Sequence, residues 1–280
     1  MNPCSAQHVT ADVLENVPLA ERTFRVRLRC PDIASRIRPG QFLMLRLPGR
    51  TDPLLARPFA LYDTVLDDAG EPFAVDVVYL VVGKMTKLLA DVREGDRLEI
   101  WGPLGNGFPE LGNVPHVALV AGGIGQTPFL AYVRELLGSR GYAGEPPRRR
   151  ADRVTLFYGV RSANLAAGVD AFQEAGATVH IATEDGTAGE RGYVTRVLAD
   201  TCTDAPIVAC GPEPMLHAVA KLAADWHVGC YVSLETPMAC GVGICFSCVT
   251  RVKQNDGWDY QRVCVDGPVF DATKLVWEND

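Results

Sequence analysis

The chain has 280 residues, of which 48% are hydrophobic and 22% are charged, and its formal net charge at pH 7 is −7. This balance is that of an ordinary globular protein and excludes a disordered or fibrous chain. The negative charge argues against nucleic acid or an anionic membrane as the main partner, and the length allows two or three domains.

The beginning of the chain has no basic start followed by an apolar stretch, and no apolar run approaches the ~20 residues that cross a bilayer. We therefore expect a cytoplasmic protein that makes no contact with a membrane. The nine cysteines are then not expected to form disulfides, because the cytoplasm is reducing. Four cysteines are clustered late in the chain, and the other five are interpreted as small buried hydrophobes: Cys4, Cys30, Cys202, Cys210 and Cys230.

Residues 8 to 48 and 57 to 101 consist of short apolar runs separated by turn signals. The run from Thr23 to Leu28 alternates with period two, as a half-buried strand does. We predict an antiparallel β-barrel for residues 1–110.

From about Val114 the pattern changes to apolar strand candidates that alternate with helical stretches. This order predicts a parallel sheet with helices on its faces for residues 111–234. The strand candidates are 115–121, 153–159, 177–182, 205–210 and 229–234, and the helical stretches lie near 127–138, 164–175, 192–199 and 213–225. Residues 235–280 are too few to fold on a core of their own and need a metal centre or a neighbour.

The late cysteines form C-x4-C-x2-C followed by a fourth cysteine, and they are Cys240, Cys245, Cys248 and Cys264. The spacing of the first three cysteines matches the plant-type spacing for a 2Fe-2S cluster. Gly241 and Gly243 give the loop backbone freedom to wrap a cluster. The alternative is a zinc site, but four-cysteine zinc sites usually contain two C-x2-C pairs. The spacing favours the cluster.

A cluster moves one electron at a time, so coupling it to a two-electron donor requires a flavin, and two nucleotide sites are expected. One candidate follows a strand and opens a helix, where backbone N–H groups can bind phosphate: Gly122, Gly123, Gly125 and Thr127. Taken alone, such a glycine turn is structural about as often as it binds a phosphate. The second lies in the barrel, where an arginine can pair with pyrophosphate: Arg57, Pro58, Phe59, Ala60, Gly83 and Thr86. Taken alone, Arg57 is an ordinary surface charge.

Several motifs in this order resemble the ferredoxin-NADP reductase superfamily, and within it the electron-transfer subunits of NAD-dependent dihydroorotate dehydrogenases. The likeness covers nearly the whole chain. The motifs are Pro39 to Phe42, Arg57 to Ala60, Val81 to Thr86, Gly102 to Phe108, the Gly122 loop, Cys210-Gly211-Pro212 with Met215, and Glu235 leading into the four cysteines.

The resemblance implies FAD on the barrel, with Arg57 at its pyrophosphate, residues 57–60 beside its ring system, and Gly83 and Thr86 at its phosphates. NAD would lie across the Gly122 loop, with Cys210 and Gly211 near the nicotinamide. Two residues depart from the family pattern: Ala60 stands where Ser or Thr is usual, and Met85 where Gly is common. Ala60 leaves no side-chain hydroxyl for the flavin.

Glu184 follows the third strand of the α/β region, where the family places the adenosine ribose. An acidic group there would bind a 2'-hydroxyl and repel a 2'-phosphate, which favours NAD over NADP. A simple acidic turn over residues 184–186 is an equally good interpretation.

The implied reaction is a relay of hydride and single electrons among NAD, FAD and the cluster, in which no side chain acts as nucleophile or general base. Because a barrel that oxidises dihydroorotate takes ~250 residues, a separate catalytic flavoprotein subunit is expected, in a heterotetramer serving pyrimidine biosynthesis. Two alternatives stay open. The chain could be the reductase subunit of a transhydrogenase, hydrogenase or sulfide dehydrogenase, or a nucleotide-binding regulatory protein with structural zinc.

Overall fold

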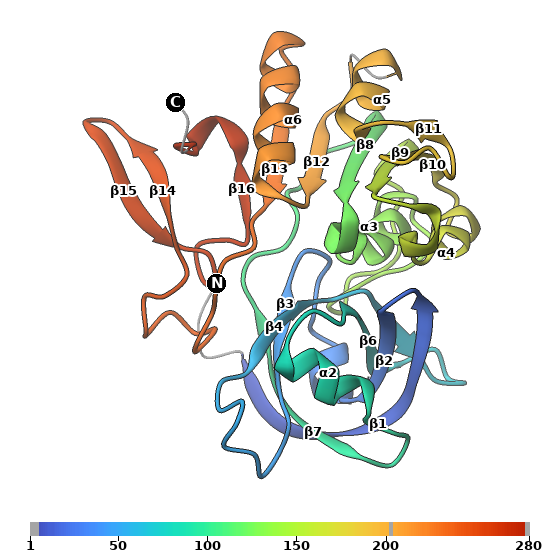
Figure 1. Cartoon of the computed structure of the whole chain (residues 1–280), viewed down its shortest axis with the longest axis vertical. Helices are drawn as coiled ribbons and strands as arrows, with labels where there is room; N and C mark the ends of the chain where they lie inside the picture. Colours follow the sequence, from blue (N-terminus) through green and yellow to red (C-terminus); the bar gives the residue numbers. More distant parts are fainter. Residues whose placement is uncertain (1–5, 202–203, 278–280) are drawn as a thin grey trace.

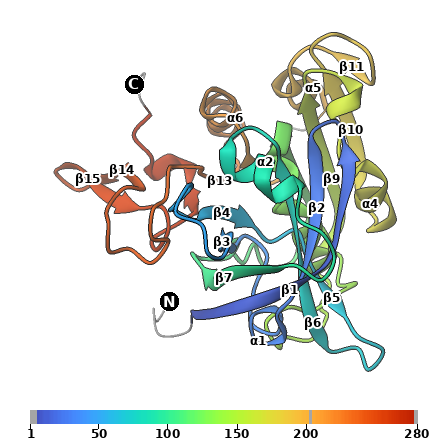
Figure 2. The same cartoon turned by 60° about the horizontal axis from the view of Figure 1, so that its bottom comes forward.

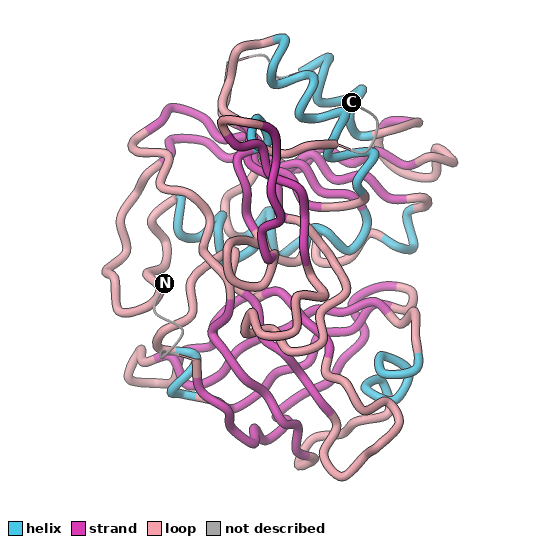
Figure 3. Tube along the Cα trace, turned by 90° about the vertical axis from the view of Figure 1, so that its left-hand side faces the viewer, coloured by secondary structure: helices cyan, strands magenta, loops and turns pink. Residues whose placement is uncertain are grey.

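The computed structural model describes residues 6–201 and 204–277, so Cys4 and Cys202 lie outside the described residues. The chain forms a barrel, an α/β layer above it, and a C-terminal segment beside both (Figure 1). Viewed from the side of the C-terminal segment, strands fill the lower half, and strands with helices fill the upper half (Figure 3). None of the described helices is both long and apolar enough to cross a membrane.

The barrel is a sheet of seven antiparallel strands in the order β4-β3-β7-β1-β2-β6-β5. Its edge strands β4 and β5 are joined by residues 61 and 62 alone, so the sheet must curl until its edges meet, and the predicted barrel is confirmed. Its elements are β1 (Gln7–Ala20), β2 (Thr23–Arg29), α1 (Pro31–Ala34), β3 (Phe42–Arg46), β4 (Arg57–Ala60), β5 (Asp63–Leu66), β6 (Pro72–Leu80), α2 (Lys84–Ala90) and β7 (Arg97–Leu104).

The α/β layer contains a parallel sheet in which every predicted strand is present. The helical stretch expected near 164–175 is instead a short 3₁₀ turn followed by α4, with Gly168 in the left-handed region at φ +73 between them. The elements are β8 (Val114–Gly122), η2 (Gly123–Gln126), α3 (Phe129–Leu136), β9 (Ala151–Val160), η3 (Ala163–Leu165), α4 (Val169–Glu174), β10 (Thr178–Thr183), β11 (Glu190–Arg191), α5 (Val194–Thr201), β12 (Ile207–Cys210), α6 (Glu213–Asp225) and β13 (Cys230–Ser233).

The C-terminal segment forms a hairpin of β14 (Val249–Gln254) and β15 (Gly257–Arg262), then β16 (Val269–Asp271) and η4 (Ala272–Lys274). Strand β16 pairs antiparallel with β13, so the sheet predicted to be parallel has one antiparallel strand at its edge. The segment buries Val252, Val263, Phe270, Leu275 and Trp277 in the core that it shares with β12, β13 and α6. The segment therefore completes its hydrophobic core against the α/β layer, as expected for a segment too short to form a core alone.

Two barrel residues fix the C-terminal segment to the barrel. Asn106 donates to the Val269 carbonyl at 3.0 Å and accepts from the Val269 N–H at 3.1 Å. Trp101 donates from Nε1 to the Cys240 carbonyl at 3.0 Å. Figure 2 shows the β14–β15 hairpin projecting away from the barrel beyond these anchors.

A buried carboxylate joins the barrel to the α/β layer. Asp63 begins β5, its side chain is 6% exposed, and it forms ion pairs with Arg134 of α3 and with Arg140. It also accepts from the Tyr142 hydroxyl at 2.7 Å and from the Thr64 N–H at 2.8 Å. Burial raises the pKa of Asp63, and the arginines and Tyr142 oppose that shift.

We expect Asp63→Ala to lower the free energy of unfolding by about 3 kcal/mol, because two guanidinium groups and a hydroxyl lose their shared acceptor. Urea denaturation followed by tryptophan fluorescence measures the loss. The matched control is Asp52→Ala, which breaks an ion pair with Lys84 whose side chains are 72% and 60% exposed, and it should cost less than about 1 kcal/mol. Equal losses in the two variants would contradict this account.

Candidate functional site

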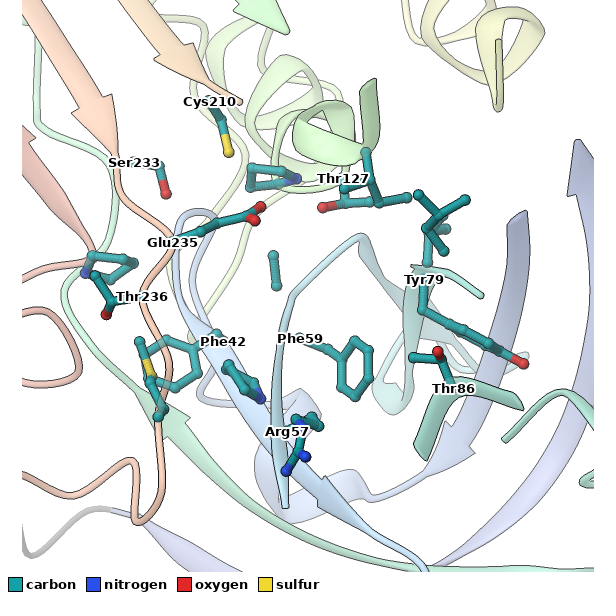
Figure 4. A pocket seen from close by; sticks show the side chains of 18 of the residues that line it. Phe42, Arg57, Phe59, Tyr79, Thr86, Thr127, Cys210, Ser233, Glu235 and Thr236 are labelled. Carbon is teal, nitrogen blue, oxygen red and sulfur yellow. The ribbon is translucent and has the colours of Figure 1, made fainter. Parts of the chain in front are cut away.

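A cavity of about 650 Å³ lies where the barrel, the α/β layer and the C-terminal segment meet. Its size is typical of sites for small molecules and cofactors. Figure 4 shows side chains from all three parts pointing into it. The residues predicted for the nucleotide sites that line it are Arg57, Pro58, Phe59, Ala60, Gly83, Thr86, Thr127 and Cys210.

The barrel wall of the cavity suits a charged group at one end and a flat ring at the other. Arg57 Nη1 donates to the carbonyls of Leu55 and Ala56 at 2.9 and 3.0 Å, which fixes the guanidinium at the cavity. Phe59 packs edge-on against Tyr79, with ring centroids 6.1 Å apart. A guanidinium and an aromatic wall are the partners that a pyrophosphate and a flavin ring require.

Thr86 contributes to this wall mainly by shaping its loop. Its hydroxyl accepts from the N–H groups of Val82 and Gly83, each at 3.0 Å, and donates to the Gly83 carbonyl at 3.2 Å. Gly83 precedes α2, and a side chain there would meet no atom within 4 Å. The open space over Gly83 fits the close approach of a ligand phosphate.

The α/β wall of the cavity lies at the point where the strand order reverses. From β8 the chain winds outward through β9 and β10, and it then returns to place β12 and β13 on the other side of β8. Ligands of such sheets bind at the carboxyl ends of the strands at this switch point. Gly122 ends β8 here, and Cys210 ends β12 with Gly211 next to it.

Glycines bring these two strand ends together. A Cβ on Gly125 would lie 2.3 Å from the Cys210 carbonyl oxygen, and one on Gly211 would lie 2.9 Å from the Gly122 nitrogen. Gly123, at φ +56, has no atom within 4 Å of that position, so its backbone stays open to a ligand. The loop between β8 and α3 therefore packs closely against the end of β12 at Gly125 and is open to a ligand at Gly123.

Glu184 follows β10 at the same carboxyl edge but outside the cavity, and its N–H donates to the Val160 carbonyl at 3.2 Å. Its neighbour Asp185 forms the acidic turn, accepting from the Thr187 N–H and hydroxyl at 3.0 and 2.6 Å. The side-chain hydrogen bond from Thr187 lowers the pKa of Asp185. The turn interpretation thus accounts for Asp185 but not for the side chain of Glu184.

Three polar residues line the cavity at the end of β13 and just after it: Ser233, Glu235 and Thr236. Sequence reasoning gave none of them a role at the site, although Glu235 belongs to one of the motifs that carry the resemblance. Desolvation by the surrounding protein raises the pKa of Glu235, although the residue keeps surface exposed to the cavity. The buried Thr236 hydroxyl has no hydrogen-bond partner among the described residues, which fits a site that binds a polar ligand. Polar residues at the carboxyl end of a buried strand were the signal that could have found them.

The four late cysteines meet in two pairs. Cys240 contacts Cys245, and the hydroxyl and N–H of Ser247 lower the pKa of Cys245 to about 6, with a further contribution from Cys240. Cys264 contacts Cys248, and burial first, with Cys248 second, raises the pKa of Cys264 to about 12. Nowhere in 6–201 and 204–277 do three His, Cys, Asp or Glu side chains surround a point that could hold one metal ion. Two thiol pairs are compatible with the four-thiolate ligation of a 2Fe-2S cluster.

The cluster loop lies against the barrel, and it reaches this position through left-handed backbone at Gly241 and Gly243, with φ +73 and +82. A Cβ on Gly241 would lie 2.6 Å from Cγ of Met44. The glycine expected for loop freedom is therefore also required for close packing. The other described cysteines, Cys30, Cys210 and Cys230, are free and buried, as the sequence indicated.

Three family models match the chain. They describe an oxidoreductase FAD-binding domain at residues 10–108, an oxidoreductase NAD-binding domain at 119–221, and the iron-sulfur cluster binding domain of dihydroorotate dehydrogenase B at 235–276. The electron transfer subunit of dihydroorotate dehydrogenase B (NAD(+)) from Bacillus velezensis is 36% identical over 96% of this chain and 98% of its own length. The subunit of the same name from Caldanaerobacter subterraneus is 34% identical over 95% and 98%.

The chain belongs to the family of dihydroorotate dehydrogenase B electron transfer subunits. As in that family, it is an oxidoreductase subunit with domains for FAD, NAD and an iron-sulfur cluster. A chain in a solved structure of the NADH-dependent reduced ferredoxin-NADP oxidoreductase is also similar, with 28% identity and a TM-score of 0.80 over 96% of this chain and 90% of that one. The superfamily resemblance and the fold class are confirmed.

We expect Cys248→Ser to abolish the visible absorption and the reduced-state paramagnetic signal of the cluster, because one of its four thiolate ligands is lost. Iron and acid-labile sulfide should fall to background, while NADH still reduces the flavin. Anaerobic purification with elemental analysis and electron paramagnetic resonance provides the measurement. Cys230→Ser, at a buried cysteine of β13, is the matched control and should retain both signals. Full cluster content in Cys248→Ser would refute the assignment.

Arg57→Ala should weaken FAD binding about tenfold to a hundredfold, the equivalent of a hydrogen bond to a charged group. Fluorescence titration of the apoprotein with FAD measures the dissociation constant. Lys87→Ala removes an exposed positive charge of α2 that does not line the cavity, and it should leave the constant within about twofold, as surface charges normally do. A similar loss in both variants would point to general charge rather than to a contact of Arg57.

Proposed function

We propose that this chain relays electrons between a dihydroorotate-oxidising catalytic subunit and NAD, using its 2Fe-2S cluster and FAD. The observation that carries the proposal is that one short segment serves both redox sites. Residues 233–238 line the cavity, and Cys240 holds the cluster two residues later. Relatives that carry this name match the chain over almost its full length.

FAD, when bound, exchanges a hydride with nicotinamide and single electrons with a cluster, which is the chemistry that no amino-acid side chain supplies. The protein's part in this proposal is binding and orientation. Arg57 binds the pyrophosphate, Phe59 and Ala60 pack beside the flavin ring, and the Gly83 loop receives phosphate oxygens. No proton-transferring side chain is required for hydride transfer itself.

The nicotinamide nucleotide in this proposal crosses the switch point of the sheet. Gly122, Gly123, Gly125 and Thr127 form the loop under its phosphates, and Cys210 and Gly211 lie near its nicotinamide. Glu184 accepts a hydrogen bond from a ribose hydroxyl, and its carboxylate would repel the extra phosphate of NADP. The open backbone of Gly123 and the side chain of Glu184, left over by the acidic turn, support these roles.

The proposal includes domain limits of 1–110, 111–234 and 235–280, supported by family matches that fall inside each range. It also includes a cytoplasmic location in a heterotetramer with the catalytic subunit. Free thiols at Cys30, Cys210 and Cys230 are consistent with a reducing compartment.

The partner should dock at the exposed side of the cluster, since electron transfer rates fall steeply with distance. Large hydrophobic side chains are exposed there on the cluster loop and the adjacent hairpin: Ile244 at 79%, Phe246 at 62%, Trp258 at 48% and Tyr260 at 56%. Arg262 stacks over Phe246 and so links the loop to the hairpin. Exposed apolar groups of this kind are typical of interaction sites.

Co-expression with a dihydroorotate-oxidising flavoprotein from the same organism should yield a stable complex that reduces NAD with dihydroorotate. Phe246→Asp should weaken assembly by more than about tenfold, since a charge would be placed in an apolar contact. Size-exclusion chromatography and NADH absorbance are the measurements. Leu66→Asp, at an exposed barrel residue remote from the cluster loop, is the control and should assemble normally.

Stable assembly with a different oxidoreductase, and no dihydroorotate-dependent NADH formation, would overturn the proposal. The similarity to the NADH-dependent ferredoxin-NADP oxidoreductase chain favours a transhydrogenase as the second candidate. That candidate predicts reduction of ferredoxin or NADP by the assembled complex. A colourless protein that contains zinc would instead support the regulatory alternative.

A further inference from the structure

The four late cysteines come from two separate pieces of the chain. Three of them lie on the loop of residues 240–248, and the fourth, Cys264, lies on a turn of residues 262–266 that begins at the end of β15. The Val263 N–H donates to the Cys248 carbonyl at 2.7 Å and joins the two pieces at one place. A site built from four thiolates is complete only when the rest of the loop is also held against the turn.

Arg262 and Asp266 close the turn that carries Cys264. The Arg262 carbonyl accepts from the N–H groups of Val265 and Asp266 at 3.0 and 2.8 Å. The Asp266 carboxylate accepts from the Arg262 N–H at 2.8 Å and from its Nε at 3.3 Å. The carboxylate therefore fixes the direction of the guanidinium as well as the shape of the turn.

The guanidinium of Arg262 reaches from the turn to the loop. Its Nη1 donates to the Gly243 carbonyl at 3.2 Å. Its central carbon lies over the Phe246 ring, 5.4 Å from the ring centroid. Because Gly243 and Phe246 flank Cys245, one side chain contacts the loop on both sides of that cysteine.

The backbone of the loop is shaped for this contact. A Cβ on Gly243 would lie 2.6 Å from Cγ2 of Val265 and 3.1 Å from Nη1 of Arg262, so the loop and the turn meet without room for a side chain. Phe246 has left-handed backbone at φ +56, which costs a bulky residue free energy. A loop in this conformation needs contacts that retain it, and Arg262 supplies two of them.

We propose that Arg262 is a positioning residue that holds the loop 240–248 closed on the turn 262–266, so that Cys245 and Cys264 present their sulfurs to the same cluster. The inference rests on the proposed cluster site and not on the identity of the partner subunit. Arginine suits this role because its planar group can bind a carboxylate and a carbonyl and stack on a ring at the same time. Lysine has a single side-chain nitrogen and cannot make all three contacts.

The test uses the complete chain, purified anaerobically with its cluster and flavin, and two variants, Arg262→Met and Arg262→Lys. Each protein is challenged with the iron chelator bathophenanthroline disulfonate, and the acid-labile sulfide that remains is measured over time. Reduction of the flavin by NADH and the midpoint of thermal unfolding report on the rest of the chain. Arg251→Met is the matched control, because Arg251 belongs to the same hairpin but stacks over Trp258.

Arg262→Met should lose its cluster at least about tenfold faster than the wild-type chain, the factor expected for one hydrogen bond to a charged group. Arg262→Lys keeps the charge but not the geometry, and its rate should lie within about twofold of that of Arg262→Met. A folded, flavin-containing Arg262→Met that takes up no cluster would be the strongest form of this result. Arg251→Met should lose its cluster at the wild-type rate, and flavin reduction by NADH should be unchanged in every variant.

Equal rates of cluster loss in Arg262→Met and Arg251→Met would overturn the inference. Wild-type retention in Arg262→Lys would show that charge alone suffices and would also overturn it, as would a lowered unfolding midpoint with an unchanged rate of cluster loss. No partner subunit takes part in these measurements. A failure of the wild-type chain to assemble with a dihydroorotate-oxidising subunit would therefore refute the proposed function and leave this result standing.

Discussion

The segment from Ser233 to Cys240 is the physical link on which the rest of the structure depends. It leaves β13 at the switch point of the sheet, forms one wall of the cavity, and then leads into Cys240, the first of the four cysteines proposed to hold the cluster. If the same few residues hold both proposed sites, the backbone sets the distance between the two sites, and no movable interface lies between them. Electron transfer between the two sites requires such a fixed, short separation.

Contacts from both larger parts hold this segment in place. The pairing of β13 with β16 fixes its beginning, and the hydrogen bond from Trp101 to Cys240 fixes its end to the barrel. The Asn106 side chain also donates to the Val269 carbonyl and accepts from the Val269 N–H. The C-terminal segment is therefore integrated into the molecule on two sides, although it is short.

The two departures from the family pattern have different physical meanings. Met85 is buried at 3% exposure in the barrel core, where its flexible side chain fills space beside the cavity. Ala60 removes a polar group from the cavity wall, and the polar residues of the opposite wall come from residues 233–236. In this chain, polar side chains of the cavity wall opposite Ala60 therefore come from the end of β13 and the residues that follow it.

The sequence by itself determined most of the secondary-structure elements and predicted the class of cofactors. Period-two alternation predicted the barrel, alternating strands and helices predicted the α/β sheet, and the spacing of Cys240, Cys245 and Cys248 predicted the cluster, because these are local properties of the chain. Only the tertiary structure decided that β16 joins the edge of the sheet, that Asp63 joins two parts through Arg134 and Arg140, and that Ser233 lies beside Cys210 at the ends of neighbouring strands. These contacts unite residues far apart along the chain, and no local pattern encodes which distant strand or helix becomes a neighbour.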